Sequence, residues 1–121
     1  MTRNVLTIAA DESIENAAAR MAEAGVHHLV VRGKRGAVVG VISRTDVARA
    51  PLTARVADFM PHRLLSVRSD TPVAHAAALM RTYGIGSLPV MTGSRLIGIV
   101  TVSDMLDLVE TENPATSATR H

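Results

Sequence analysis

The sequence predicts an α+β fold in which two β-α-β-β-α repeats pack about a pseudo-twofold axis. Two observations support this: an internal repeat within the 121 residues, and the same order of hydrophobic periodicities in both copies. A shift of 59 residues superposes Leu6 on Leu65, Asp11 on Asp70, Met21 on Met80, Gly25 on Gly84 and Val31 on Val90. A shift of 58 then superposes Gly40 on Gly98, Ser43 on Thr101 and Asp46 on Asp104. Because half of this chain is too short to bury a sufficient core, we expect the copies to share one.

Each copy contains a helix near its start. The i, i+3, i+4, i+7, i+8 spacing of a helix with one apolar face occurs at Ile14, Ala17, Ala18, Met21 and Ala22, and again at Val73, Ala76, Ala77 and Met80. We expect Asp11 to cap the first helix, and Asp70-Thr71 followed by Pro72 to supply a cap and a first-turn proline for the second. Gly25 and Gly84 lie where a left-handed residue can end each helix.

Two strands and a second helix complete each copy. Strands are expected over residues 26–31 and 38–42, and over 85–91 and 96–101, with polar turns at 33–36 and 92–95. The last helices are expected to open at Thr45-Asp46 and Ser103-Asp104. The predicted division is a first repeat over residues 1–50, a linker and lead-in over 51–64, a second repeat over 65–110 and a disordered tail over 111–121.

Composition argues against several classes of protein. The chain has no cysteine, which excludes thiol catalysis, disulfides and cysteine-ligated metals. No apolar run approaches the ~18 residues that cross a bilayer, so we expect a cytoplasmic protein without a membrane partner. The net charge is only +2 and acidic residues are spread along the chain, so nucleic acid is not an expected partner. With one Tyr and one Phe, ligand stacking on aromatic rings is not expected either.

No catalytic set or metal site is predicted. The sequence lacks a Gly-x-x-x-x-Gly-Lys-Ser/Thr loop, a Gly-x-Ser-x-Gly elbow and a His-Glu-x-x-His helix. A phosphohydrolase that used Asp46 or Asp104 would need further carboxylates clustered for a metal, and neither motif supplies them. His27 and His28 are adjacent on a predicted strand, so they point to opposite faces and cannot bind one ion. We therefore expect no enzyme activity.

A repeated motif carries a family resemblance. The pattern Gly-hydrophobic-hydrophobic-Ser/Thr-x-x-Asp occurs as Gly40-Val41-Ile42-Ser43-Arg44-Thr45-Asp46 and as Gly98-Ile99-Val100-Thr101-Val102-Ser103-Asp104. The second copy also has Gly84-Ile85-Gly86-Ser87-Leu88-Pro89-Val90, and Val56-Ala57-Asp58-Phe59-Met60 precedes it. Over roughly residues 4–110 these features resemble CBS domains, which occur in tandem as a Bateman module.

The resemblance implies a ligand-sensing module that binds AMP, ADP, ATP or S-adenosylmethionine in up to two clefts and requires no cofactor. Each cleft would combine the Ser/Thr-x-x-Asp of one repeat with the first strand and the Leu-Pro-Val strand of the other. Site A would comprise Ser43, Arg44, Asp46, Leu65, Val67, Ile85, Gly86, Ser87 and Pro89. Site B would comprise Thr101, Val102, Asp104, Leu6, Ile8, Val26, His27, His28 and Leu29. We expect site A to be better formed, because bulky His27-His28 and Val30 stand where the other copy has Gly86-Ser87 and Pro89.

Several roles stay open at this point. A carboxylate at a helix start can accept hydrogen bonds from both ribose hydroxyls, and it can also cap the helix. Phosphate candidates are Arg44, Arg63, Arg68 and Arg95, of which Arg44 lies inside a motif. The resemblance further implies a homodimer formed through helices and an unidentified protein target. The alternative is a CBS-fold module for dimerisation and partner docking that uses no nucleotide.

Overall fold

The first repeat forms a three-stranded sheet with helices on one face. The computed structural model describes residues 3–105, so the predicted end of the second repeat at 106–110 and the predicted tail lie outside the described residues. The elements are β1 (Thr7–Ala9), α1 (Ile14–Ala24), β2 (His28–Arg32), the single-turn helix η1 (Lys34–Gly36), β3 (Val38–Ser43) and α2 (Arg44–Ala48). Strand β2 is central, parallel to β1 and antiparallel to β3.

The second repeat has the same topology. After the short helix α3 (Val56–Phe59) of the lead-in, its elements are β4 (Val67–Arg68), α4 (Val73–Tyr83), β5 (Ser87–Thr92) and β6 (Arg95–Thr101), followed by helical residues at 102–105. Strand β5 is central, parallel to β4 and antiparallel to β6. The α+β class and the β-α-β-β-α order predicted for both copies are confirmed.

The helix ends agree with the sequence in part. Gly25 and Gly84 end α1 and α4 with φ of 65° and 63°, the left-handed conformation that was predicted. The predicted cap at Asp11 is wrong: Ser13 caps α1, and its hydroxyl accepts a hydrogen bond from the Asn16 amide at 3.1 Å. Because α1 begins at Ile14, Asp11 lies too far back to reach the first free amides.

The start of α4 also differs from the expectation. Pro72 occupies the cap position with ψ of 144°, so it precedes the first helical residue instead of being it. The Thr71 hydroxyl accepts a hydrogen bond from the Arg68 amide at 3.0 Å, and Asp70 pairs with the Arg68 side chain. Both polar side chains therefore stabilise the turn before the helix, which has no side-chain cap.

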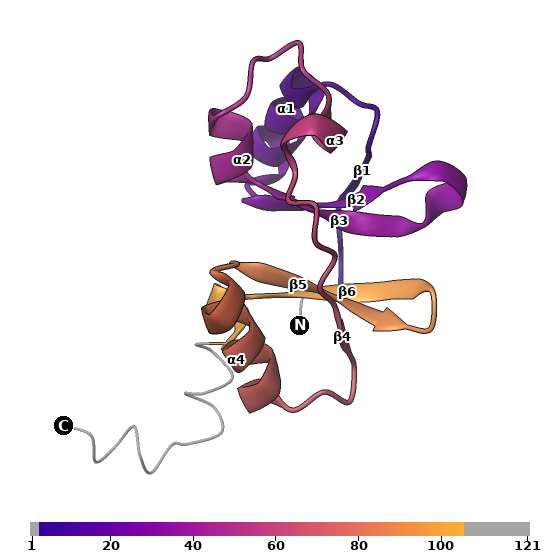
Figure 1. The fold of residues 1–121 in the computed structure, drawn as a ribbon, viewed down its shortest axis with the longest axis vertical. Coiled ribbons are helices and arrows are strands. Elements are labelled where there is room, and N and C mark those ends of the chain that lie inside the picture. Colours follow the sequence, from indigo (N-terminus) through magenta and orange to yellow (C-terminus); the bar gives the residue numbers. More distant parts are fainter. Residues whose placement is uncertain (1–2, 106–121) are drawn as a thin grey trace, which may run out of the picture.

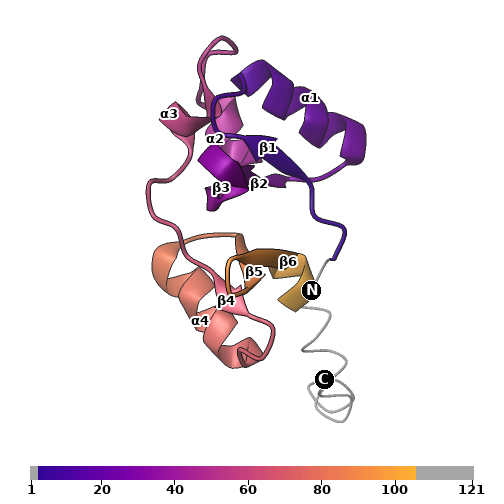
Figure 2. The same ribbon diagram turned by 90° about the vertical axis from the view of Figure 1, so that its right-hand side faces the viewer.

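The two halves stack as helix, sheet, sheet and helix. Figure 1 shows α1 and α2 outside the first sheet and α4 outside the second, with the two sheets facing each other; the turned view in Figure 2 shows the same order. In the described part of the chain, no helix has the length and apolar character needed to cross a membrane.

The copies do not share one core, contrary to the expectation. One cluster of buried residues lies between the first sheet and its helices, and a second between the second sheet and α4. Val30 and Pro89 are also buried but belong to neither cluster. Since neighbouring side chains on a strand point to opposite faces, these two lie on the inner faces, where the sheets meet. The sheet-to-sheet layer therefore joins two small cores.

The segment that leads into the second repeat packs on the first half. Val56 in α3 is fully buried in the first cluster. Its amide donates to the Glu12 carbonyl at 2.9 Å, and the Ile14 amide donates to the Ala54 carbonyl at 2.8 Å. This packing holds the chain against the first half before it passes along the junction at residues 61–65.

Candidate functional site

The start of α2 forms a capping box. The Ser43 hydroxyl accepts a hydrogen bond from the Asp46 amide at 3.2 Å. In return, Asp46 Oδ2 accepts hydrogen bonds from the Ser43 amide and from the Ser43 hydroxyl, both at 2.9 Å. The cap is thus Ser43, at the end of β3, and not the predicted Thr45-Asp46 pair. Within the described residues, the second carboxylate oxygen of Asp46 has no hydrogen-bond partner.

The end of β6 repeats this geometry. The Thr101 hydroxyl accepts from the Asp104 amide at 3.2 Å, and Asp104 Oδ2 accepts from the Thr101 amide at 3.0 Å. The reciprocal bonds explain the spacing of the Ser/Thr-x-x-Asp motif, since residues three apart meet across the first turn of a helix. The carboxylates are held in a defined direction at the ends of the two sheets.

A cleft of about 700 Å³, here called cleft A, opens beside Asp46 at the junction of the halves. Six of the residues predicted for site A line it: Ser43, Asp46, Leu65, Ile85, Gly86 and Ser87. Val67 and Pro89 do not, because their side chains are buried inside the fold. Arg44 does not line cleft A either; its Nη1 lies 3.5 Å from His27 Nε2, beside a separate groove between α1 and α2.

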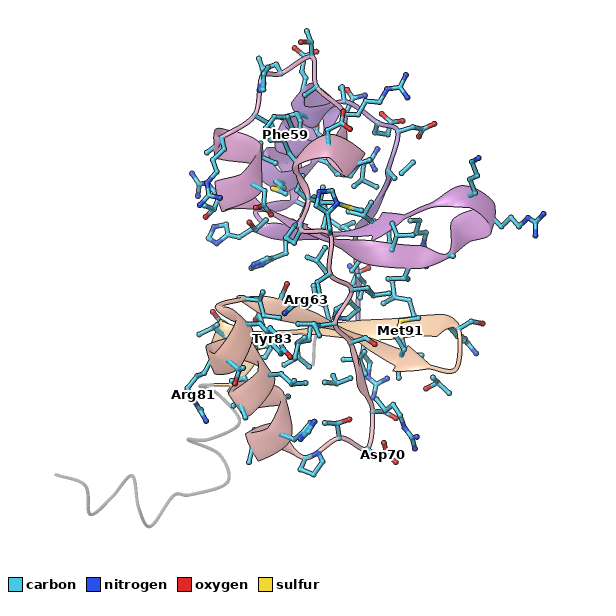
Figure 3. All side chains as sticks on the ribbon, viewed as in Figure 1. Phe59, Arg63, Asp70, Arg81, Tyr83 and Met91 are labelled. Carbon is cyan, nitrogen blue, oxygen red and sulfur yellow. The ribbon has the colours of Figure 1, made fainter. Side chains whose placement is uncertain are left out.

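The remaining lining of cleft A was missed by sequence reasoning about the motif. It includes Gly40, Val41, Thr45, Arg49, Pro61, His62, Arg63, Leu64, Tyr83 and Gly84, together with His28. The Arg63 guanidinium lies 4.8 Å from the centre of the Tyr83 ring, and Figure 3 shows this pair between the two halves. The chain's one tyrosine thus lines the cleft beside Arg63, and the expectation that no ligand stacks on an aromatic ring stays a prediction.

The other phosphate candidates lie elsewhere. Arg68 forms an exposed ion pair with Asp70 at 3.0 Å, and Arg95 is exposed at the start of β6; neither lines cleft A. Arg63 was one of four candidates in the sequence, of which the motif favoured Arg44. The available signal for Arg63 was its position two residues before Leu65, a predicted site residue.

A second cleft of about 440 Å³, cleft B, lies at the pseudo-symmetric position. Of the residues predicted for site B, it is lined by Leu6, Val26, His27, His28, Thr101 and Val102. Asn4, Val5, Gly25, Gly86, Ile99 and Ser103 complete the lining. Asp104 is not part of it, and Ile8 and Leu29 are buried in the first core.

His28 lies at the wall between the two clefts and lines both, whereas the sequence assigned it to site B alone. A Cβ atom on Gly86 would lie 3.1 Å from His28 Nε2, so the missing side chain at Gly86 makes room for the imidazole. Burial lowers the pKa of His28 below its usual 6.5, and neighbouring His27 lowers it further, while Asp46 opposes the shift. The neutral form of the imidazole is thus favoured.

The described residues contain no group of three His, Cys, Asp or Glu side chains that could hold a metal ion. Hydrogen-bonding and apolar side chains line both clefts, and two arginine side chains line cleft A in addition.

Comparison with known proteins identifies a family for both halves. Residues 1–53 and 56–111 each match the CBS domain. The magnesium transporter MgtE of Thermus thermophilus is 39% identical over 88 residues, which cover 72% of this chain and 20% of the transporter. The chain spans only about a fifth of the length of the curated relatives it matches first.

Solved structures of similar fold include ligand complexes. The CBS domain pair of protein MJ0100, in complex with 5′-methylthioadenosine and S-adenosyl-L-methionine, has a TM-score of 0.83 and 28% identity, covering 93% of both chains. The cytosolic domain of the Mg²⁺ channel MgtE, in complex with ATP, has a TM-score of 0.76 and 32% identity, covering 89% of this chain and 46% of that one.

Proposed function

Because the chain belongs to the CBS domain family and contains a tandem pair of these domains, we propose that it is a regulatory sensor that binds an adenosine-containing ligand between its two repeats. CBS domain pairs are generally regulatory and not catalytic. The observation that carries the proposal is cleft A, in which the Ser43-x-x-Asp46 capping box of one repeat faces Leu65 and residues 85–87 of the other.

The lining of cleft A suits an adenosine group. The unpartnered oxygen of Asp46 is available to accept hydrogen bonds from ribose hydroxyls, while Oδ2 holds the carboxylate in place. Leu65 and Ile85 provide apolar walls for the adenine ring, and the backbone around Gly86 provides groups for its polar edge. The cavity volume of about 700 Å³ lies within the range of small-molecule sites, roughly 300–1,000 Å³.

The relatives support the ligand class. One similar domain pair was solved with 5′-methylthioadenosine and S-adenosyl-L-methionine, and another with ATP. These ligands share adenine and ribose but differ in the group attached to the ribose 5′ carbon. The adenosyl group is therefore the common element of the proposal. Homodimer formation, a cytoplasmic location and a protein target that reads the bound state belong to the same proposal.

A thermal-shift panel tests the proposal. The protein is melted with AMP, ADP, ATP, S-adenosylmethionine, adenosine and, as a control, GTP. A ligand at 100 times its dissociation constant stabilises by ~2.7 kcal/mol, so a rise of several degrees with adenine compounds and none with GTP is expected.

A variant with an obstructed ligand site serves as the control for the thermal-shift panel. Gly86 lines both clefts, and the side chain of Gly86→Leu would project toward His28 and fill the space between residues 86 and 28. A melting curve without ligand checks that this variant folds, and the adenine-dependent shift should then be lost. If no adenine compound stabilises the unaltered protein, the sensor proposal fails and the alternative, a dimerisation and docking module without nucleotide, takes its place.

A further inference from the structure

The two clefts share a framework but differ in charge. Cleft A is lined by Arg49 and Arg63, with Asp46 as its one acidic side chain, whereas the described lining of cleft B contains no Arg, Lys, Asp or Glu. Within the described residues neither arginine forms an ion pair. Cleft A therefore carries positive charge that no described carboxylate neutralises by direct contact.

The internal repeat shows that the positive charge of cleft A has no counterpart at the equivalent positions of the other repeat. At the offset of 59 residues, Arg63 corresponds to Asn4 and Tyr83 to Ala24. At the offset of 58, Arg49 corresponds to Asp107, which lies outside the described residues. The adenosyl-binding framework is thus duplicated, while the cationic and aromatic residues that line cleft A, drawn from both repeats, are replaced by other residue types at the equivalent positions.

Arg63 is also held in place. Its guanidinium lies 4.8 Å from the Tyr83 ring centre, a cation–π contact that restricts an otherwise mobile side chain. The ring comes from the last turn of α4 and the arginine from the lead-in at residues 61–65, so their pairing keeps the guanidinium at the cleft (Figure 3). Nearby His62 adds a further nitrogen donor to the same wall.

We propose that cleft A selects adenosine polyphosphates, the class of ADP and ATP, through Arg49 and Arg63, and that this selection is confined to cleft A. The inference rests on the adenosyl-binding function proposed above. Planar guanidinium groups bind phosphate oxygens with paired, charge-assisted hydrogen bonds, and two of them match a chain of two or three phosphates. The single carboxylate, Asp46, can accept hydrogen bonds from the ribose hydroxyls of the same ligand.

Calorimetric titration tests the proposed selection for polyphosphates. The buffer contains no divalent cations, and the probes are ATP, ADP, AMP and adenosine. We expect each of Arg49→Gln and Arg63→Gln to weaken ATP binding by about tenfold, corresponding to about 1.4 kcal/mol, and the double variant by about a hundredfold. Adenosine affinity should stay unchanged in all three. Raising the salt concentration should weaken ATP binding and leave adenosine binding nearly constant.

Arg95→Gln is the matched control, because it removes the same charge from an exposed position outside both clefts. Arg63→Lys keeps the charge and should retain more ATP affinity than Arg63→Gln. A double variant that binds ATP as tightly as the unaltered protein overturns the phosphate selection while adenosyl binding stands. Failure of every adenine compound to bind removes the proposed function itself, and the selection with it. Melting curves confirm that each variant is folded before its affinity is compared.

Discussion

Replacing Asp46 by alanine separates the two roles of the carboxylate at the start of α2. The side chain is half-buried, and its Oδ2 accepts hydrogen bonds from the Ser43 amide and hydroxyl at 2.9 Å. Asp46→Ala removes this acceptor oxygen and with it both hydrogen bonds. It leaves the opposite half of the capping box, in which the Ser43 hydroxyl accepts from the amide of residue 46 at 3.2 Å.

The expected loss of stability is moderate. The hydrogen bonds that Asp46 accepts from Ser43 contribute about 1 kcal/mol, and a carboxylate in the first turn adds about 0.3–1 kcal/mol through the helix dipole. We therefore expect Asp46→Ala to lower the free energy of unfolding by about 1.5 kcal/mol. At about 4 °C per kcal/mol for a domain of this size, the melting temperature should fall by about 6 °C. The stabilisation by ligand in cleft A, ~2.7 kcal/mol at 100 times its dissociation constant, should be lost in addition.

The assay is thermal unfolding with and without ATP, in the Asp46→Ala, Ser43→Ala and Asp104→Ala variants. Ser43→Ala loses the cap hydroxyl but keeps the carboxylate, so it should lower stability and retain more of the ATP response. Asp104→Ala removes the matching carboxylate at the other helix start and should leave cleft A intact. An unchanged melting temperature in Asp46→Ala would refute the capping argument. An unchanged ATP response would exclude Asp46 from the ligand site.

Three further predictions concern the core, a helix end and pH. Leu88 is fully buried in the second core, so Leu88→Ala should lower the free energy of unfolding by about 2–5 kcal/mol, as measured by denaturant titration. Leu52 is 54% exposed, so Leu52→Ala should change this free energy by no more than about 0.5 kcal/mol in the same titration. In Gly84→Ala the added Cβ atom has no other atom within 4 Å, but the residue keeps a φ of 63°, so backbone strain should lower the free energy of unfolding by about 1 kcal/mol. A change near zero in denaturant titration would contradict the left-handed helix end. For His28, folding lowers the pKa below 6.5, so the unfolded chain takes up the proton first as the pH falls. The free energy of unfolding should therefore decline as the pH falls through 6.5 toward the lower folded pKa, and part of this decline should vanish in His28→Gln; identical pH profiles for the two proteins would count against the shift.

The curated relatives that the chain matches first are longer proteins, of which it covers about a fifth. A ligand can shift the packing of the pair only if its affinity differs between two arrangements of the halves. His28 lines both clefts, and its Nε2 would lie 3.1 Å from a Cβ atom placed on Gly86, so the two clefts share this side chain as a wall.

The sequence by itself determined the order of elements, the repeat and the two helix ends at Gly25 and Gly84. These features depend on interactions within a few residues: the i, i+3, i+4 spacing of apolar side chains and the left-handed conformation of the two glycines. Even here the local competition for caps was misjudged at Asp11, because several polar residues precede α1 and the exact first residue of the helix decides which one is used.

Only the tertiary structure decided which side chains meet in the clefts. Strand alternation buried Ile8, Leu29 and Val67, although the motif had placed them at the ligand sites. Packing of the lead-in segment against the first half brought Arg63 beside Tyr83, 20 residues later in the sequence, and placed both in the cleft that Asp46 also lines. No local pattern encodes that meeting, because it arises where two separately formed sheets face each other and their loops converge at the junction.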